Sequence, residues 1–380
     1  MKTSTAAAAI PNARPFLYGQ EASAITAALR SGQYGHTDTT DAFEAAIAAF
    51  LDVPDAVAVA SGTSALHVAL LAAGIGPGDE VIVPSLTFCA SVQAILATGA
   101  APRFADVSPR TLCVDSHHVL DALTPSTRAV VPVLYGGRAV DLADAEPALA
   151  ERGITVIEDA AHAFGSYAGT RRVGATGKLT CFSFGPIKNL TCGQGGMIVP
   201  RSPEEAEKCR LLRGLGIVES PAQRAEATSY TVDGFGLRAQ MSSLNAAVGL
   251  AQLDHFTETQ TARKALWRTY ADALHDVGGA TLIDVDIEQS VPHLCAVLVA
   301  ARDRDHVFRT LRRRGIGVGT HYPPNHQQPA FATWSRPLPV TEGVGREILT
   351  LPFHQHMTHA DAEHVGMELG KAIVEAEADR

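Results

Sequence analysis

Cysteine is scarce in this chain of 380 residues, and no two cysteines form a CxxC pair. Zinc sites and redox pairs need such close spacing, and small disulfide-bonded domains need many more cysteines. The sequence therefore predicts no metal site and no disulfide framework. We expect reduced and mostly buried thiols at Cys89, Cys113, Cys181, Cys192, Cys209 and Cys295.

Basic runs, long apolar runs and a dinucleotide-binding glycine motif are also missing. The longest basic run is Arg312–Arg314 and the formal net charge is −9, which argues against nucleic-acid binding. The apolar residues before Pro11 are too few for a signal peptide or a membrane span, so we expect a cytoplasmic protein without a membrane partner. No GxGxxG joins a strand to a helix, which argues against a nicotinamide dehydrogenase.

The composition is that of an ordinary globular protein, with 46% hydrophobic and 19% charged residues. The chain exceeds the length at which one hydrophobic core stops growing. We therefore expect two domains, a large one of residues 1–255 and a smaller C-terminal one of residues 256–380.

The predicted large domain alternates between strand and helix patterns. Val57–Val59 reads as a strand, residues 66–73 carry apolar side chains at helical spacing, and Glu80–Pro84 reads as a second strand. A similar alternation recurs through residues 128–166. Parallel strands joined by crossover helices have this pattern, so we predict an α/β domain with a mostly parallel sheet between helices.

The pattern changes near Phe256. Helical spacing runs through residues 259–279, residues 293–301 read as a strand, and residues 359–378 read as a closing helix. The smaller domain is therefore predicted to be α+β.

The turn SGTSALHV, residues 61–68, follows a predicted strand and opens a predicted helix. Free backbone N–H groups at the helix start and the hydroxyls of Ser61, Thr63 and Ser64 suit a phosphate. A simple helix cap would use the same residues, so the turn alone does not decide between the two interpretations.

Two further residues become informative when they are combined with this turn. Asp159 ends an apolar strand at the edge where α/β sheets bind ligands, although an acid there can simply cap a helix. Lys188 has no charged neighbour between Lys178 and Arg201. A desolvated lysine forms Schiff bases, whereas a surface lysine is the plainer alternative. A phosphate cradle, a strand-end acid and an isolated lysine are together what pyridoxal phosphate requires.

In longer blocks the chain strongly resembles the DegT-type sugar aminotransferases, which are pyridoxal-phosphate enzymes of the aspartate aminotransferase fold, fold type I. The resemblance runs nearly end to end and implies a homodimer with two shared active sites. Its blocks are ASGTSALHVAL, DEVIVPSLTFCAS, VIEDAAHAFGS, FSFGPIKNLTCGQGGMIV, RAQMSSLNAAVGLAQL, HYPPNHQQPAF and LPFHQHMTHAD.

The resemblance implies a role for each matching residue. Lys188 is expected to be the Schiff-base lysine and the proton carrier, and Asp159 the partner of the cofactor's ring nitrogen. Phe88 is expected to lie against the face of the cofactor ring, with a plain core phenylalanine as the alternative. The phosphate is expected to be held by Gly62, Thr63, Ser64 and Ser183.

Two positions depart from the family pattern. His162 stands where relatives often have glutamine, near the cofactor's phenolic oxygen, and a histidine can still donate a hydrogen bond there. Gly236, in GFGLR, stands where relatives usually carry an asparagine that reaches the phosphate of the neighbouring subunit. Arg238 remains as a candidate contact for the phosphate or a substrate carboxylate, with interface packing as the alternative.

The resemblance also implies that the loop HYPPNHQQP lies over the active site. The loop offers His321, Tyr322 and His326 as candidate substrate-binding residues, although each histidine could equally face solvent.

The expected reaction transfers an amino group from glutamate or glutamine to the cofactor and then to a ketone. The expected acceptor is a keto sugar linked to a nucleotide, in amino-sugar or secondary-metabolite biosynthesis, and a keto cyclitol of aminoglycoside-type pathways is the alternative. A cofactor-dependent sugar dehydratase is disfavoured because known members replace the lysine with histidine. A cofactor-binding protein without turnover is disfavoured by the intact pair of Asp159 and Lys188.

Overall fold

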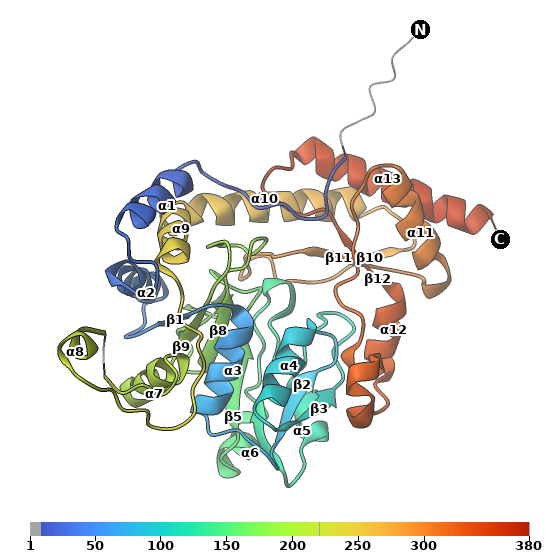
Figure 1. The fold of residues 1–380 in the computed structure, drawn as a ribbon. Coiled ribbons are helices and arrows are strands. Elements are labelled where there is room, and N and C mark those ends of the chain that lie inside the picture. Colours follow the sequence, from blue (N-terminus) through green and yellow to red (C-terminus); the bar gives the residue numbers. More distant parts are fainter. Residues whose placement is uncertain (1–8, 220, 380) are drawn as a thin grey trace.

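The computed structural model describes residues 9–219 and 221–379. Its larger part is a seven-stranded sheet with helices on both faces (Figure 1). The strands lie side by side in the order β1, β9, β8, β5, β4, β2, β3. Their bounds are β1 Val57–Val59, β2 Glu80–Pro84, β3 Ala101–Ala105, β4 Thr127–Val130, β5 Thr155–Asp159, β8 Leu179–Ser183 and β9 Gly196–Val199.

The sheet is mostly parallel, as the alternating sequence pattern predicts. Strands β8, β5, β4, β2 and β3 pair in parallel. Strand β9 runs antiparallel to both β8 and β1, so β1 points the same way as the other five. The predicted α/β fold class is therefore confirmed.

Strand residues alternate between two apolar clusters, one on each face of the sheet. In β2, Val81 and Val83 pack in one cluster, whereas Ile82 packs in the other. Helices α3 (Gly62–Ala72) and α4 (Cys89–Ala97) contribute to the first cluster, and α2 (Asp38–Leu51) and α9 (Ser243–Asp254) contribute to the second. Because both faces are covered, the strands carry apolar residues at consecutive positions and not on alternate residues only. The other helices of this part are α1 Glu21–Arg30, α5 Ser116–Ala122, α6 Glu146–Glu151, α7 Pro203–Arg213 and α8 Pro221–Glu226.

The C-terminal part packs a third apolar cluster between helices and a three-stranded antiparallel sheet. Helix α10 begins at Phe256, where the sequence pattern changes, and α13 covers the predicted span (Figure 1). The elements of this part are α10 Phe256–Leu274, β10 Ala280–Leu282, β11 Cys295–Val299, α11 Ala301–Arg313, α12 Pro339–Glu347, β12 Ile348–Leu351 and α13 His359–Ala378.

The predicted division at residues 255 and 256 stays a prediction, because contacts cross it. The ring of Phe256 packs at 4.9 Å from that of Phe164 in the larger part. The N-terminal segment, in turn, joins the C-terminal part: the Asn12 amide donates a hydrogen bond to the Thr350 carbonyl at 3.0 Å, and the Phe353 N–H donates one to the Asn12 carbonyl at 2.9 Å.

Two sequence expectations concern the molecule as a whole. The six cysteines are free thiols, and all except the exposed Cys89 are buried. Within residues 9–219 and 221–379, no helix combines the length and the apolar character that crossing a membrane would require.

Candidate active site

A cavity of about 710 Å³ lies at the carboxyl ends of β5 and β8. This is the edge at which α/β sheets bind their ligands. The walls come from the start of α3, the start of α4, the loop that follows β8 and the loop at residues 320–325. The structure brings most of the predicted site residues together here: Gly62, Thr63, Phe88, Asp159, His162, Ser183, Lys188, His321 and Tyr322.

Asp159 presents a buried carboxylate to the cavity from the last position of β5. The Ser91 hydroxyl donates a hydrogen bond to Asp159 Oδ2 at 2.6 Å, and the Ala161 N–H donates one to Oδ1 at 3.2 Å. Burial raises the pKa of Asp159, while the Ser91 hydrogen bond and the nearby Lys188 charge oppose the rise. A protonated ring nitrogen in the cavity would relieve the desolvation of this carboxylate.

Lys188 lies in the loop between β8 and β9, and its backbone N–H donates a hydrogen bond to the Gly185 carbonyl at 3.1 Å. Burial lowers the pKa of Lys188 to about 8, although the Asp159 carboxylate favours the charged amine. The desolvation inferred from the isolated lysine is therefore present in the folded chain. An amine with this pKa is available as a nucleophile and a base near neutral pH.

The start of α3 forms a cradle for an anion. Ser61 caps the helix by accepting a hydrogen bond from the Ser64 N–H at 3.0 Å, and Gly62 and Thr63, at the start of the helix, line the cavity. Gly62 lies so close to β8 that a Cβ on it would stand 2.7 Å from the Ser183 Cβ. The close approach places the Ser183 hydroxyl beside the helix start, and the positive end of the helix dipole adds to the attraction for an anion.

His162 directs one ring nitrogen to the backbone and the other to the cavity. The Gly136 N–H donates a hydrogen bond to His162 Nδ1 at 3.3 Å, so this nitrogen acts as an acceptor. His162 Nε2 therefore carries the proton, and it lies 3.1 Å from the Tyr322 hydroxyl. Burial lowers the pKa of His162 well below its ordinary value, and the charges of Lys188 and His321 lower it further. His162 is a neutral N–H donor.

The loop at residues 320–325 brings a second group of side chains over the cavity, as the sequence predicts. His321 Nδ1 lies 2.6 Å from the Thr350 hydroxyl, and the Tyr135 hydroxyl donates to the His321 carbonyl. The Tyr322 ring stands 5.7 Å from that of Phe88, between centroids. Phe88 is 56% exposed, which excludes the alternative of a core phenylalanine.

The comparisons with known proteins agree with this geometry. The sequence profile of the DegT/DnrJ/EryC1/StrS aminotransferase family matches residues 17–369. The chain belongs to this family. It is therefore a pyridoxal-phosphate-dependent aminotransferase of fold type I, and the family, the fold and the cofactor predicted from the sequence are confirmed.

Three solved structures resemble the chain over almost its whole length. The aminotransferase TlmJ from Streptoalloteichus hindustanus is 33% identical, with a TM-score of 0.90 over 97% of this chain and 100% of that chain. DesV from S. venezuelae, solved with a ketimine intermediate, is 36% identical, with a TM-score of 0.86 over 94% of each chain. The sugar aminotransferase CalS13 from Micromonospora echinospora is 28% identical, with a TM-score of 0.88 over 95% of this chain and 99% of that chain.

The residues present fit pyridoxal phosphate. The cradle that a Cβ on Gly62 would fill suits the phosphate, and the buried Asp159 carboxylate suits a protonated ring nitrogen. Lys188 supplies an amine of lowered pKa in the same cavity.

Three predicted site residues lie elsewhere in the aminotransferase. Ser64 hydrogen-bonds with the capping Ser61 and does not line the cavity. His326 is buried with Nδ1 2.7 Å from the Ser85 hydroxyl and does not line the cavity, so the structure does not place it where it would contact substrate as predicted. Arg238 is exposed, pairs with Gly214 in a β-bridge, and is not part of the cavity wall of its own chain.

Gly236 has a structural reason to be glycine. A Cβ on this residue would stand 2.5 Å from the Gly216 nitrogen and 2.6 Å from the Leu212 carbonyl oxygen. The GFGLR segment of this aminotransferase is therefore packed against the backbone of residues 212–216, and an asparagine at position 236 would displace it.

Sequence reasoning missed several polar residues of the cavity wall. Ser91 lies one helical turn after Phe88 at the start of α4, a spacing that could have revealed it. Gln194 stands in the GQGG run that follows Lys188. Asn325 donates hydrogen bonds to the Ser85 and Thr87 carbonyls and so fixes the loop over the cavity; no local signal identifies it.

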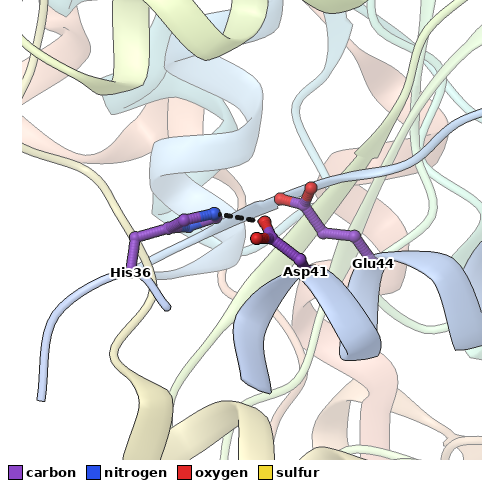
Figure 2. Close-up of side chains that lie close together, drawn as sticks. All are labelled: His36, Asp41 and Glu44. Carbon is purple, nitrogen blue, oxygen red and sulfur yellow. Dashed lines mark hydrogen bonds and ion pairs between the residues drawn. The ribbon is translucent and has the colours of Figure 1, made fainter. Parts of the chain in front are cut away.

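A separate group of side chains brings possible metal ligands together outside the cavity (Figure 2). The ligand atoms of His36, Asp41 and Glu44 lie within 4.8 Å of one another. Glu44, however, forms a buried ion pair with Arg213 and accepts a hydrogen bond from the Ala58 N–H at 2.8 Å. The Arg213 guanidinium already supplies the positive charge that a cation would bring.

The close approach at Gly62 gives a first prediction. Gly62→Ala is expected to lower the free energy of unfolding by about 1–3 kcal/mol, because the new methyl group must push Ser183 away. It is also expected to weaken pyridoxal-phosphate binding by deforming the cradle. Chemical denaturation and equilibrium dialysis measure the two effects. Gly343→Ala is the control: no atom lies near that position in α12, so a slight gain in stability is expected there, and equal losses in both variants would contradict the prediction.

The lowered pKa of His162 gives a second prediction. The unfolded chain binds a proton at this residue near pH 6.5, whereas the folded chain does not, so stability is present above pH 6.5 and is lost as the pH falls. Between pH 6 and pH 5, the free energy of unfolding of the cofactor-free wild type is expected to fall by up to about 1.4 kcal/mol more than that of His162→Gln. Urea denaturation at both pH values measures this difference. The exposed His275 is the control, and His275→Gln is expected to behave as the wild type does.

Proposed function

We propose that this aminotransferase moves an amino group from glutamate or glutamine to a keto sugar, most simply one linked to a nucleotide. The observation that carries the proposal is the amine of Lys188, with its pKa of about 8, in one cavity with the Asp159 carboxylate and the α3 cradle. The likeness to the sugar aminotransferase CalS13 supports a sugar as the acceptor.

Pyridoxal phosphate, when bound, supplies an aldehyde for a lysine amine and a ring that accepts the electrons of a Cα–H bond. The residues of the chain do the rest. With a pKa of about 8, roughly a tenth of Lys188 is neutral at pH 7, compared with roughly 0.03% of a lysine with a pKa of 10.5. This fraction lets Lys188 remove a proton from the donor and return it to the acceptor. Asp159 holds the positive charge on the ring, and His162 donates a hydrogen bond into the cavity.

A keto cyclitol is the second candidate acceptor, and the charge of the cavity favours it. Lys188 is the only lysine or arginine among the cavity-lining residues in the described part of the chain. The pyrophosphate of a nucleotide-linked sugar would therefore need cations from a second copy of the chain. A neutral keto cyclitol needs none.

Separating the two half-reactions tests the proposal. Glutamate and glutamine are added singly to the purified holoenzyme, and the loss of the lysine-linked cofactor absorption shows which one donates. The aminated enzyme is then mixed with nucleotide-linked keto sugars, free keto sugars and keto cyclitols, and recovery of the absorption is measured together with the mass of the product. If none of these three classes of ketone restored the cofactor absorption, the proposed acceptor would be refuted.

We further propose that two copies of the chain share their active sites. The segment that carries Arg238 also exposes Phe235 completely and Val232 by 55%, an apolar surface that a second copy would cover. Sedimentation should therefore give a particle of two chains of 39.9 kDa.

Arg238→Ala should weaken the binding of cofactor or donor about tenfold, as loss of a charge-assisted hydrogen bond does. Unchanged affinity for both would exclude the role of Arg238.

A further inference from the structure

Two buried histidines lie in contact beside the active-site lysine. The rings of His162 and His293 are 4.2 Å apart between centroids, with an angle of 36° between their planes. Both are more than nine-tenths buried. His293 precedes β11 in the C-terminal part, so the pair joins the two parts of the chain next to Lys188.

Hydrogen bonds fix the proton positions of both rings. The Asn189 side-chain amide donates to the Val291 carbonyl at 2.9 Å, so its oxygen is the atom that faces His293 Nδ1 at 3.3 Å. His293 Nδ1 therefore carries a proton. Gly136 connects the two residues: its backbone N–H donates to His162 Nδ1, and its carbonyl accepts from the backbone N–H of His293 at 2.9 Å.

His293 also separates His162 from a second, smaller cavity. This cavity, of about 50 Å³, is lined by His293, Asn12, Thr350 and Phe353, and Lys188 lines both this cavity and the large one. His293 lines the small cavity and His162 does not. The His293 ring, which contacts His162, thus forms the wall of His162 toward this space, which is large enough for water, while His162 itself lines the large cavity.

We propose that His293 is a positioning residue: its ring covers His162 and keeps that side chain an uncharged N–H donor toward the cofactor site. A histidine held in this way behaves like a glutamine amide, which also donates an N–H and never becomes charged. The pair explains how this chain uses histidine where relatives often have glutamine. The inference rests on the cofactor assignment and needs no particular acceptor.

The surroundings of the pair agree with an uncharged His162. The groups that face it are Lys188, His321, Tyr322 and Tyr135 in addition to His293. The buried Arg263 lies behind His293, where it donates hydrogen bonds to the His293 and Pro292 carbonyls at 3.2 Å. Positive charges from Lys188 and Arg263 oppose protonation of His293, and burial opposes it for both rings.

The test titrates the visible absorption of the bound cofactor between pH 5 and pH 7, without any substrate. With the cofactor in the large cavity, His293→Ala opens His162 to the small cavity, so water reaches that ring from the side of His293. Its proton affinity is then expected to rise at least tenfold, to give a new transition within this pH range. His293→Phe keeps the wall and is expected to titrate as the wild type does. His293→Ser replaces the alanine variant if that variant does not fold.

The double variant His162→Gln/His293→Ala identifies the group that titrates. The new transition is expected to vanish in it, because glutamine does not bind protons at these pH values. A transition that persists in the double variant, or an alanine variant that titrates as the wild type does, would overturn the proposal. Failure of the purified protein to bind pyridoxal phosphate would instead count against the cofactor assignment, which keeps the two failures distinct.

Discussion

Lys188→Ala is expected to lower kcat/KM for transamination at least about 10⁴-fold while the fold remains intact. The variant loses both the amine that links to the cofactor and the group that moves the proton, and general acid–base catalysis alone contributes about 10²- to 10⁴-fold. The loss should appear in each half-reaction measured separately. Borohydride reduction of the wild-type holoenzyme, followed by peptide mass analysis, should find the cofactor attached to Lys188.

Two variants control this experiment. Lys188→Arg keeps a positive charge but offers no nucleophilic amine, so it is expected to be as inactive as the alanine variant. Lys178 lies outside the cavity and forms ion pairs with Glu146 at 3.5 Å and Glu158 at 3.9 Å. Lys178→Ala should therefore keep nearly full activity. Cofactor trapped on another lysine, or substantial activity in Lys188→Arg, would contradict the role of Lys188.

The parts of the site that the sequence predicts are those set by local structure. Gly62 and Thr63 open a helix directly after a strand, and Asp159 ends a strand, so chain direction alone brings them to one edge of the sheet. Lys188 has no charged neighbours in the sequence, as suits a buried amine, and burial in the folded chain lowers its pKa. These inferences needed no knowledge of distant contacts.

The parts that the sequence does not predict depend on contacts between distant segments. Distant hydrogen-bond partners decide which of the two histidines faces the cavity: Thr350 contacts His321, and Ser85 contacts His326. The contact of His162 with His293 joins residues 131 positions apart and follows no periodicity. The same holds for Asn12, which the predicted division at residue 256 assigns to the large domain although it hydrogen-bonds with the C-terminal part.

Burial of titratable side chains in the active site lowers the free energy of unfolding of the cofactor-free protein. Lys188 and His162 lose proton affinity through burial, and Asp159 gains it. Each shift disfavours the charged form of a group that lines the buried cavity, as expected of a site that binds a charged cofactor. Bound pyridoxal phosphate should therefore stabilise the fold by more than its buried area alone suggests.

Asp159→Asn is the variant that separates the effect of this carboxylate on stability from its effect on catalysis. Burial raises the pKa of Asp159, so the carboxylate destabilises the cofactor-free fold above the pKa of the unfolded chain, and the neutral amide does not. The cofactor-free variant is expected to unfold at a temperature no lower than that of the wild type. With cofactor and donor, however, kcat should fall about 10²- to 10⁴-fold, because removing one partner of a buried charge pair costs about 3–5 kcal/mol.

The neighbouring acid provides the matched control for Asp159. Glu158 is buried on the same strand, but it contacts Thr180 at 2.9 Å and does not line the cavity. Glu158→Gln should leave kcat near the wild-type value. Thermal unfolding with and without pyridoxal phosphate completes the comparison, because the cofactor should stabilise Glu158→Gln as much as the wild type and Asp159→Asn much less. Equal stabilisation of both variants would show that Asp159 does not hold the charge of the ring, and the assignment of the strand-end acid would have to be abandoned.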